Sequence, residues 1–169
     1  KEPWNVPIWQ IGNETSYDPN GFDCATTAQK TRVFAERMKK ADPEIKLVAW
    51  GDDGWASAVV AESKGLIDYV ACHIHFGRKN KHSPLHGNRY REDYAKTWDE
   101  LMNAHIITEN RIKKVRGELD GTGVGLALTE GHFALRGRNR GDVLGTWAAG
   151  VANARILNCH ARNGDLVKI

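Results

Sequence analysis

Two glutamates stand at corresponding places in the sequence, each at the end of a largely apolar run. Glu14 follows Ile8–Ile11 after a glycine and an asparagine, and Glu130 closes the run Val124–Thr129. A pair of carboxyl groups is what the hydrolysis of a glycosidic bond needs, because one must protonate the leaving oxygen while the other attacks the anomeric carbon or activates a water. The sequence therefore predicts Glu14 and Glu130 as a catalytic pair.

Histidines accompany these carboxylates. His73 and His75 are two residues apart in an apolar run, so they share one face of a strand, and His132 follows Glu130 by two. We interpret them as hydrogen-bonding groups beside Glu130, and no metal or cofactor is expected. Two histidines at this spacing can also bind zinc, so a metal-dependent hydrolase that uses His73, His75 and His132 stays an alternative.

Strands and helices alternate along the chain and would position these side chains. Strands are predicted at residues 8–11, 46–50, 68–76 and 124–129, with another starting at 166–169, and helices at 23–40, 56–63, 90–119 and 142–162. The strands are nearly continuous apolar runs, which is typical of a parallel sheet covered on both faces. The alternation predicts an α/β fold.

The first strand distinguishes two parallel architectures. An open, doubly wound sheet usually carries a glycine-rich phosphate turn after this strand, whereas Gly12-Asn13-Glu14 is not such a turn. In a barrel, polar residues at the carboxyl ends of several strands converge on one cleft. Five strands, however, suit an open sheet, so the residues alone leave both architectures open: an open doubly wound sheet or part of a (β/α)8 barrel.

Composition excludes several classes of function. The 169 residues carry a net charge of +3, and their basic residues gather only in the short run Arg136–Arg140, so no nucleic-acid partner is expected. No apolar run approaches the roughly 18 residues of a membrane span, and no secretion signal is visible. Three widely spaced cysteines argue against a disulfide framework and favour a reducing, cytoplasmic location.

Three segments resemble a known clan of enzymes. Trp9–Glu14 resembles the fourth strand of the retaining glycoside hydrolases built on (β/α)8 barrels, in which the Asn-Glu pair supplies the acid/base. Leu126–Glu130 resembles the seventh strand, whose glutamate is the nucleophile, and Asp68–His75 resembles the sixth. The resemblance implies that Glu14 is the acid/base, that Glu130 is the nucleophile, and that Asn13 contacts the sugar 2-hydroxyl.

Within that clan the chain is most similar to the α-L-arabinofuranosidases of glycoside hydrolase family 51. Further similarities lie in Lys46–Gly51, Ala152–Asn158 and Arg162–Lys168. They imply a parallel (β/α)8 TIM barrel, of which this chain supplies about five strands. Residues 1–169 are then a single segment comprising strands 4 to 8 of that catalytic barrel. The implied activity is release of α-L-arabinofuranosyl residues from plant-type oligo- or polysaccharides by double displacement. The substrate-binding residues expected beside the carboxylates are Asn13, Trp50, His73, His75 and His132, with core packing an equal alternative for Trp50.

Two departures from the family pattern matter. Position 75 is histidine where the family usually has tyrosine, and strands 1 to 3, with an early arginine, are not in this sequence. A complementary barrel segment, from the same or another chain, is therefore expected as a partner, and a homo-oligomer stays open. Other readings are a β-xylosidase, endo-glucanase or agarase of the same clan, and a non-catalytic half-barrel that serves in binding or assembly.

Overall fold

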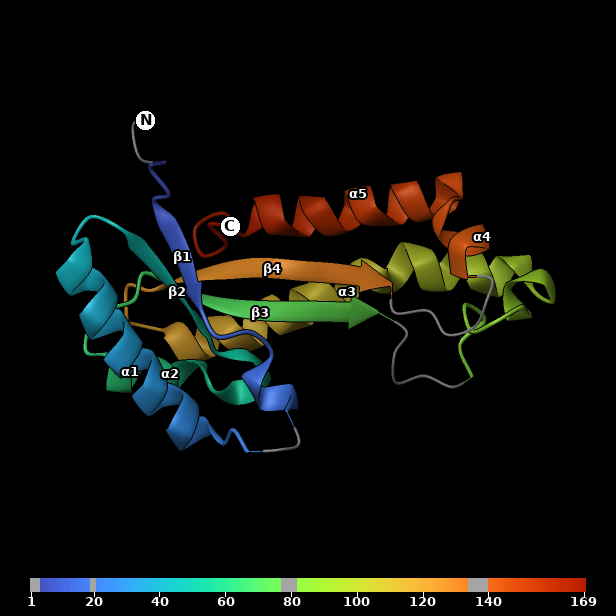
Figure 1. Ribbon diagram of the computed structural model, residues 1–169. Coiled ribbons are helices and arrows are strands. Elements are labelled where there is room, and N and C mark those ends of the chain that lie inside the picture. Colours follow the sequence, from blue (N-terminus) through green and yellow to red (C-terminus); the bar gives the residue numbers. More distant parts are fainter. Residues whose placement is uncertain (1–3, 19–20, 77–81, 134–139) are drawn as a thin grey trace. The chain divides into compact units, whose positions relative to one another are not determined.

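The computed structural model describes residues 4–18, 21–76, 82–133 and 140–169. Within these residues the strands are β1 (Ile8–Ile11), β2 (Lys46–Trp50), β3 (Tyr69–Phe76) and β4 (Gly125–Phe133). The α-helices are α1 (Cys24–Ala41), α2 (Ala56–Ser63), α3 (Tyr94–Leu119), α4 (Arg140–Leu144) and α5 (Trp147–Arg162), and short 3-10 turns lie at Thr15–Tyr17, Asp52–Gly54 and Arg89–Arg91. The strands form one sheet in the order β1-β2-β3-β4 (Figure 1).

This order carries information about topology. Each strand neighbours the next one in sequence, and β2 pairs in parallel with both β1 and β3. A doubly wound sheet reverses its strand order at a switch point, whereas the strands of a barrel follow one another without reversal. The predicted parallel α/β sheet is confirmed, and its order is the one that a barrel segment would have.

The chain divides into two compact units. The first comprises the described parts of Lys1–Cys72, Val115–Thr129 and Leu166–Ile169, and the second those of His73–Lys114 and Glu130–Asp165. β3 and β4 each contribute their first residues to the first unit and their last residues to the second.

The first unit is built on buried apolar strands. β2 pairs with β1 from Ile8↔Lys46 to Ile11↔Ala49, and four of the five β2 residues are buried. Its core joins β2 to the two following strands through Val48, Trp50, Ala71 and Ala127, with Trp55 and Tyr69 packed against them. Helices α1 and α2 lie side by side next to β2 (Figure 1). Burial of each large apolar side chain in this way stabilises the folded protein by about 1.5–3 kcal/mol.

Asp68 fastens the strands of this unit where they begin. Its carboxylate accepts hydrogen bonds from Lys46 Nζ at 2.7 Å and from the Leu47 amide at 2.9 Å. Its own amide donates to the Leu47 carbonyl, and its carbonyl accepts from the Gly125 amide. One residue therefore links β2, β3 and β4 at their amino-terminal ends.

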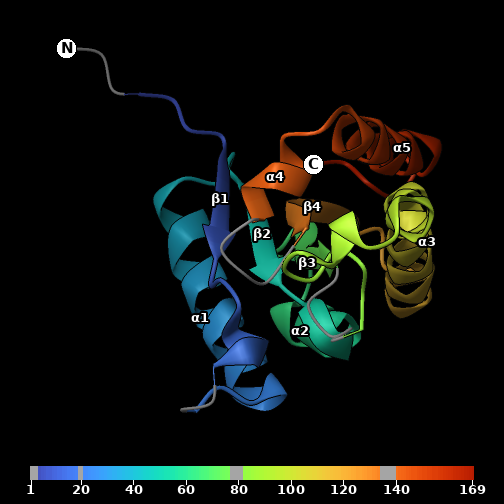
Figure 2. The same ribbon diagram turned by 90° about the vertical axis from the view of Figure 1, so that its right-hand side faces the viewer.

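In the second unit α3 and α5 lie side by side (Figure 2). Arg155 of α5 donates to the Met102 carbonyl at 2.9 Å, and Arg162 forms an ion pair with Glu109 of α3 at 2.6 Å. The buried thiol of Cys159 lies 3.4 Å from the same Glu109 carboxylate. Polar contacts at several points along their length thus hold α3 and α5 together. Among the described helices, none combines the length and the apolar character that a membrane crossing requires.

The structure corrects several predicted boundaries. β4 continues to Phe133, beyond the predicted strand end at residue 129, and α3 begins at Tyr94 rather than at residue 90. The helix predicted at 142–162 is broken, because the Thr146 hydroxyl caps a new helix by accepting from the Ala149 amide. The strand predicted at 166–169 contributes a single parallel bridge, Leu126↔Val167. Most of the basic run 136–140 lies outside the described residues.

Candidate active site

In the first unit, Glu14 lies on a turn with an unusual left-handed backbone. Gly12 has φ +75° and Glu14 has φ +52°, so the chain turns through the left-handed region twice directly after β1. For a residue with a side chain this conformation costs roughly 1–2 kcal/mol. Glu14 then starts the 3-10 turn Thr15–Tyr17, where its carbonyl accepts from the Tyr17 amide at 2.8 Å. Such a strained residue at a strand end is typical of functional positions.

The turn after Glu14 is anchored to the end of β2. The indole Nε1 of Trp50 donates to Ser16 Oγ at 3.0 Å, and the Tyr17 hydroxyl donates to the carboxylate of Asp52. The Tyr17 ring also meets the Trp50 ring edge-on, with centroids 5.7 Å apart. Because Trp50 and Asp52 are both buried, these contacts fix the turn to the interior of the first unit.

Two other predicted residues lie close to this turn in the sequence or the structure. Asn13 is exposed, and its Oδ1 accepts a hydrogen bond from Gln10 Nε2 at 3.2 Å. Trp50 is completely buried in the core of the first unit. Trp50 therefore packs in the core, which was the alternative to a sugar-stacking role. Its indole also holds Ser16 through a hydrogen bond.

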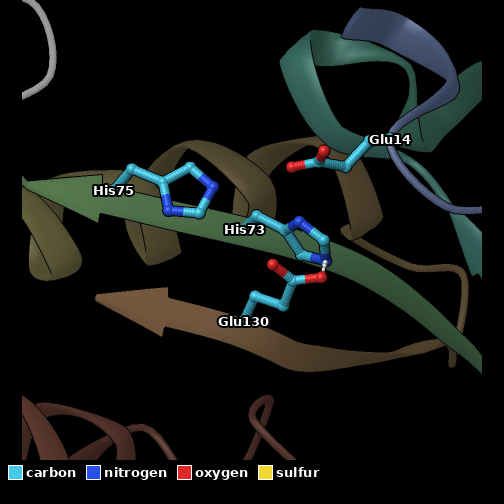
Figure 3. A group of neighbouring side chains, drawn as sticks. All are labelled: Glu14, His73, His75 and Glu130. Atoms are coloured by element: carbon cyan, nitrogen blue, oxygen red, sulfur yellow. Dashed lines mark ion pairs between the residues drawn. The ribbon is translucent and has the colours of Figure 1, made fainter. Parts of the chain in front are cut away.

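The second unit presents four polar side chains on one face of two neighbouring strands. His73 and His75 come from β3, and Glu130 and His132 come from β4. The Nε2 atom of His73 lies 3.6 Å from Oε1 of Glu130, as the dashed line in Figure 3 marks. One step along the strands, Nδ1 of His75 lies 3.1 Å from Nδ1 of His132. The alternation of side chains along a strand explains why both pairs share a face.

Burial differs sharply within this cluster. The side chain of His73 is fully buried, whereas that of Glu130 is 47% exposed. The rings of His73 and His75 meet edge-on with centroids 6.0 Å apart, and those of His75 and His132 at 4.5 Å. A fixed imidazole that reaches an open carboxylate can orient its oxygens while leaving one of them accessible to a ligand. This is the arrangement that a carboxylate nucleophile needs.

The same cluster has the donor set of a metal site. One ligand atom from each of His73, His75 and Glu130 lies within 4.8 Å of the others. Figure 3 also draws Glu14, which belongs to the first unit.

The structure therefore groups the predicted site residues as two sets. His73, His75, Glu130 and His132 come together in the second unit, and Asn13 and Glu14 lie on the anchored turn of the first. The separation of Glu14 from Glu130 stays a prediction. The anchors Ser16 and Tyr17 were not predicted, although their hydroxyls follow Glu14 by two and three residues and offered a signal for the turn.

A family model described as the alpha-L-arabinofuranosidase 1 domain matches residues 1–101. Two curated relatives named intracellular exo-alpha-(1->5)-L-arabinofuranosidase are similar to this chain. The protein from Streptomyces lividans is 30% identical over 87 residues, and the one from Acetivibrio thermocellus is 31% identical over 90 residues. These matches cover 45% and 47% of this chain but only 13% and 18% of the relatives, so the chain spans a small part of their length.

Solved structures agree with this relationship at the level of the fold. An α-L-arabinofuranosidase from Thermotoga maritima superposes on 98% of this chain with a TM-score of 0.74 and 22% identity, and this covers 33% of that protein. A GH51 arabinofuranosidase from Xanthomonas axonopodis pv. citri superposes on 99% with a TM-score of 0.77 and 17% identity, covering 36% of its chain. The relationship predicted from the strand motifs is confirmed.

Proposed function

The chain belongs to the alpha-L-arabinofuranosidase 1 domain family, and from this membership we propose that it is part of a retaining glycoside hydrolase. The proposed substrates are plant-type oligo- or polysaccharides, from which it releases α-L-arabinofuranosyl residues. The observation that carries the proposal is the exposed carboxylate of Glu130, held 3.6 Å from the buried imidazole of His73 in β3 and β4. Family membership supplies the class of substrate, and this pair supplies a group able to react with it.

In the proposed mechanism Glu130 is the nucleophile. Its carboxylate attacks the anomeric carbon and forms a covalent glycosyl-enzyme, while the protonated Glu14 gives its proton to the departing sugar oxygen. Glu14 then takes a proton from the incoming water, which displaces Glu130 and returns both residues to their first state. Asn13 would bind the sugar 2-hydroxyl, a contact that strengthens in the transition state. The mechanism requires carboxyl groups roughly 5–5.5 Å apart.

We also propose that further strands complete the barrel. Among the described residues β1 pairs only with β2, and its outer region carries the exposed side chains of Trp4, Ile8 and Trp9. An unpaired edge with apolar side chains is a surface on which another strand can add. In this proposal residues 1–169 form strands 4 to 8, and a complementary segment of the same or another chain supplies strands 1 to 3. A cytoplasmic location is proposed because two relatives are named intracellular.

The test compares two leaving groups in the protein with its barrel completed. Glu130→Gln should lower kcat on both an aryl arabinofuranoside and an arabino-oligosaccharide by roughly 10⁴–10⁶-fold, because the attacking carboxylate is lost. Glu14→Gln should lower kcat/KM, which reports the first step, by roughly 10²–10⁴-fold on the oligosaccharide and much less on 4-nitrophenyl arabinofuranoside, whose leaving group needs little protonation. Its kcat should fall on both substrates, because the attacking water loses its base.

Two glutamates outside the site serve as matched controls. Glu36 lies on α1 in an ion pair with Arg32, and Glu92 follows a 3-10 turn in the second unit. Glu36→Gln and Glu92→Gln should leave both rates unchanged. Equal losses of kcat/KM on the two substrates in Glu14→Gln would contradict its role as an acid, and turnover that survives Glu130→Gln would overturn the mechanism. If the protein hydrolyses a xyloside or a glucan faster than the arabinofuranosides, its activity is instead another one of the same clan.

A further inference from the structure

The histidine at position 75 gives this site a property that a tyrosine there would not. Nδ1 of His75 and Nδ1 of His132 are 3.1 Å apart, which is a hydrogen-bond distance between two imidazoles. One of these nitrogens must carry the shared proton while the other accepts it. When His75 donates through Nδ1, its Nε2 atom is the unprotonated nitrogen and carries a lone pair, and Figure 3 shows that side of the ring turned toward His73.

We propose that His73, His75 and Glu130 bind a divalent transition-metal ion of the zinc class. One ligand atom of each lies within 4.8 Å of the others, and the His73 Nε2 to Glu130 Oε1 distance is 3.6 Å. Two ligands each 2.0–2.1 Å from a tetrahedral zinc are separated by about 3.3 Å, so this pair needs almost no movement. Two imidazoles and one carboxylate are a donor set of known zinc sites that keep a fourth position open.

His132 acts in this proposal as a positioning residue. A histidine that binds a metal usually gives its other ring N–H to an acceptor, which fixes both the tautomer and the ring orientation. Nδ1 of His132 occupies that place relative to His75. Burial of the His73 side chain holds the second ligand in a defined orientation, while the exposed Glu130 leaves a route for the ion to enter. Both strands are extended at this point, so the ligands rest on a regular backbone.

Metal binding would control the proposed hydrolysis, and this part of the inference rests on the proposed function. A zinc ion that binds a Glu130 oxygen takes the electron pair with which that carboxylate would attack the anomeric carbon. The ion would therefore inhibit reversibly, and a chelator would restore activity. Binding of the metal itself depends only on the four side chains of the second unit.

The first experiment measures zinc binding to the 169-residue chain by isothermal titration calorimetry, with the visible spectrum of bound cobalt(II) as a second readout. We expect one ion per chain with a micromolar or lower Kd. His73→Gln, His75→Gln and His75→Tyr should abolish binding, and His132→Phe should weaken it by roughly 10–100-fold. His160→Gln, which changes a histidine of α5, should bind as the unchanged chain does. Far-UV circular dichroism confirms that each variant is folded.

The outcomes separate the metal site from the proposed function. No zinc binding by the unchanged chain, or binding that survives in folded His73→Gln and His75→Gln, overturns the site whatever the hydrolytic activity. Zinc that binds as expected while Glu14→Gln and Glu130→Gln hydrolyse normally leaves the site standing and removes the proposed function. Inhibition by zinc at its measured Kd supports the regulatory part, whereas activity that requires zinc overturns it and favours a metal-dependent hydrolase.

Discussion

The two units hold their candidate carboxylates by different physical means. Glu14 lies on a turn whose backbone is strained and whose neighbours Ser16 and Tyr17 are bonded to buried residues at the end of β2. Glu130 lies within a regular strand, and its contact is a side chain of the adjacent strand. The first carboxylate is therefore positioned by a loop and its anchors, and the second by the register of a sheet.

This difference has consequences for how each carboxylate responds to mutation. A side chain on a strand keeps its place as long as the strands stay paired, because the pleat fixes its direction. A side chain on a strained turn keeps its place only while the surrounding contacts exceed the cost of the strain. We therefore expect anchor mutations to affect Glu14 before they affect Glu130, and four predictions test this contrast.

The largest effect is expected from Trp50, which joins the core to the anchored turn. Trp50→Ala should lower the free energy of unfolding by about 3–5 kcal/mol, because it opens a large cavity and removes the donor to Ser16. Trp50→Phe keeps most of the volume and should cost only about 0.5–1.5 kcal/mol for the lost hydrogen bond beyond the change in packing.

Urea unfolding of the variants measures these costs. Trp147→Ala is the control, since this tryptophan is 85% exposed and its removal should change stability by no more than about 0.5 kcal/mol. Zinc binding by folded Trp50→Phe should equal that of the unchanged chain if the second unit depends on strand register alone. If Trp50→Phe lost both stability and zinc binding, the two units would not hold their carboxylates independently, and the contrast between them would be wrong.

Most of the fold was predictable because its cause is local in the sequence. The residues Ala56–Ser63 form the predicted helix to the residue, and the apolar run Lys46–Trp50 forms the predicted strand. The break between α4 and α5 was missed, because Thr146 becomes a cap only when its hydroxyl accepts from Ala149. The structure of residues 166–169 was also harder to predict, since it depends on the bridge between Val167 and Leu126, which are far apart in the sequence.

The site was predictable where it follows from strand alternation and less so elsewhere. The spacing of His73 and His75 places them on one face, and their approach to Glu130 and His132 follows from pairing of two strands in register. The left-handed backbone of Glu14 could not be read from the residue type, since only glycine adopts it freely. It depends on contacts with buried groups that lie more than thirty residues along the chain.

The second prediction concerns Asp68, which secures the strands at the ends opposite the histidines. Burial by itself would raise the pKa of Asp68, but hydrogen bonds from Lys46 and the Leu47 amide, with the charge of Lys39, outweigh it and lower the pKa below its ordinary value of 3.8. The stabilisation is therefore complete above that value and is lost as the pH falls through it toward the lower folded-state pKa.

Asp68→Asn should lower the free energy of unfolding near neutral pH by about 1.5–3 kcal/mol, because charged hydrogen bonds are lost. Thermal unfolding recorded from about pH 6 down to about pH 2 should show a smaller acid-induced loss in the variant than in the unchanged chain. Parallel curves for the two proteins would show that Asp68 does not carry this pH dependence.

The third prediction removes a single anchor of the Glu14 turn. Tyr17→Phe deletes the hydroxyl that donates to the buried carboxylate of Asp52, and should cost about 1–2 kcal/mol. Tyr90→Phe is the matched control, because its hydroxyl donates to Asp142 at an exposed site at 2.8 Å. That change should cost less than about 0.5 kcal/mol. Equal costs for the two variants would mean that the Tyr17 contact does not anchor the turn.

The smallest effect is expected where the strain itself is removed. Glu14 and Lys64 are the two non-glycine residues with positive φ in the described chain, and both have φ +52°. Glycine at either position should raise the free energy of unfolding by about 0.5–1 kcal/mol, since the relief of roughly 1–2 kcal/mol of strain exceeds the added entropy of the unfolded chain. Lys64→Gly should keep full hydrolytic activity, because Lys64 ends α2, whereas Glu14→Gly should lose the proposed acid. If Lys64→Gly stabilises the protein and Glu14→Gly destabilises it, the side chain of Glu14 contributes contacts that exceed the strain. The turn would then be held by that carboxylate as well as by its anchors, and the two carboxylates would be positioned in more similar ways than the backbone angles indicate.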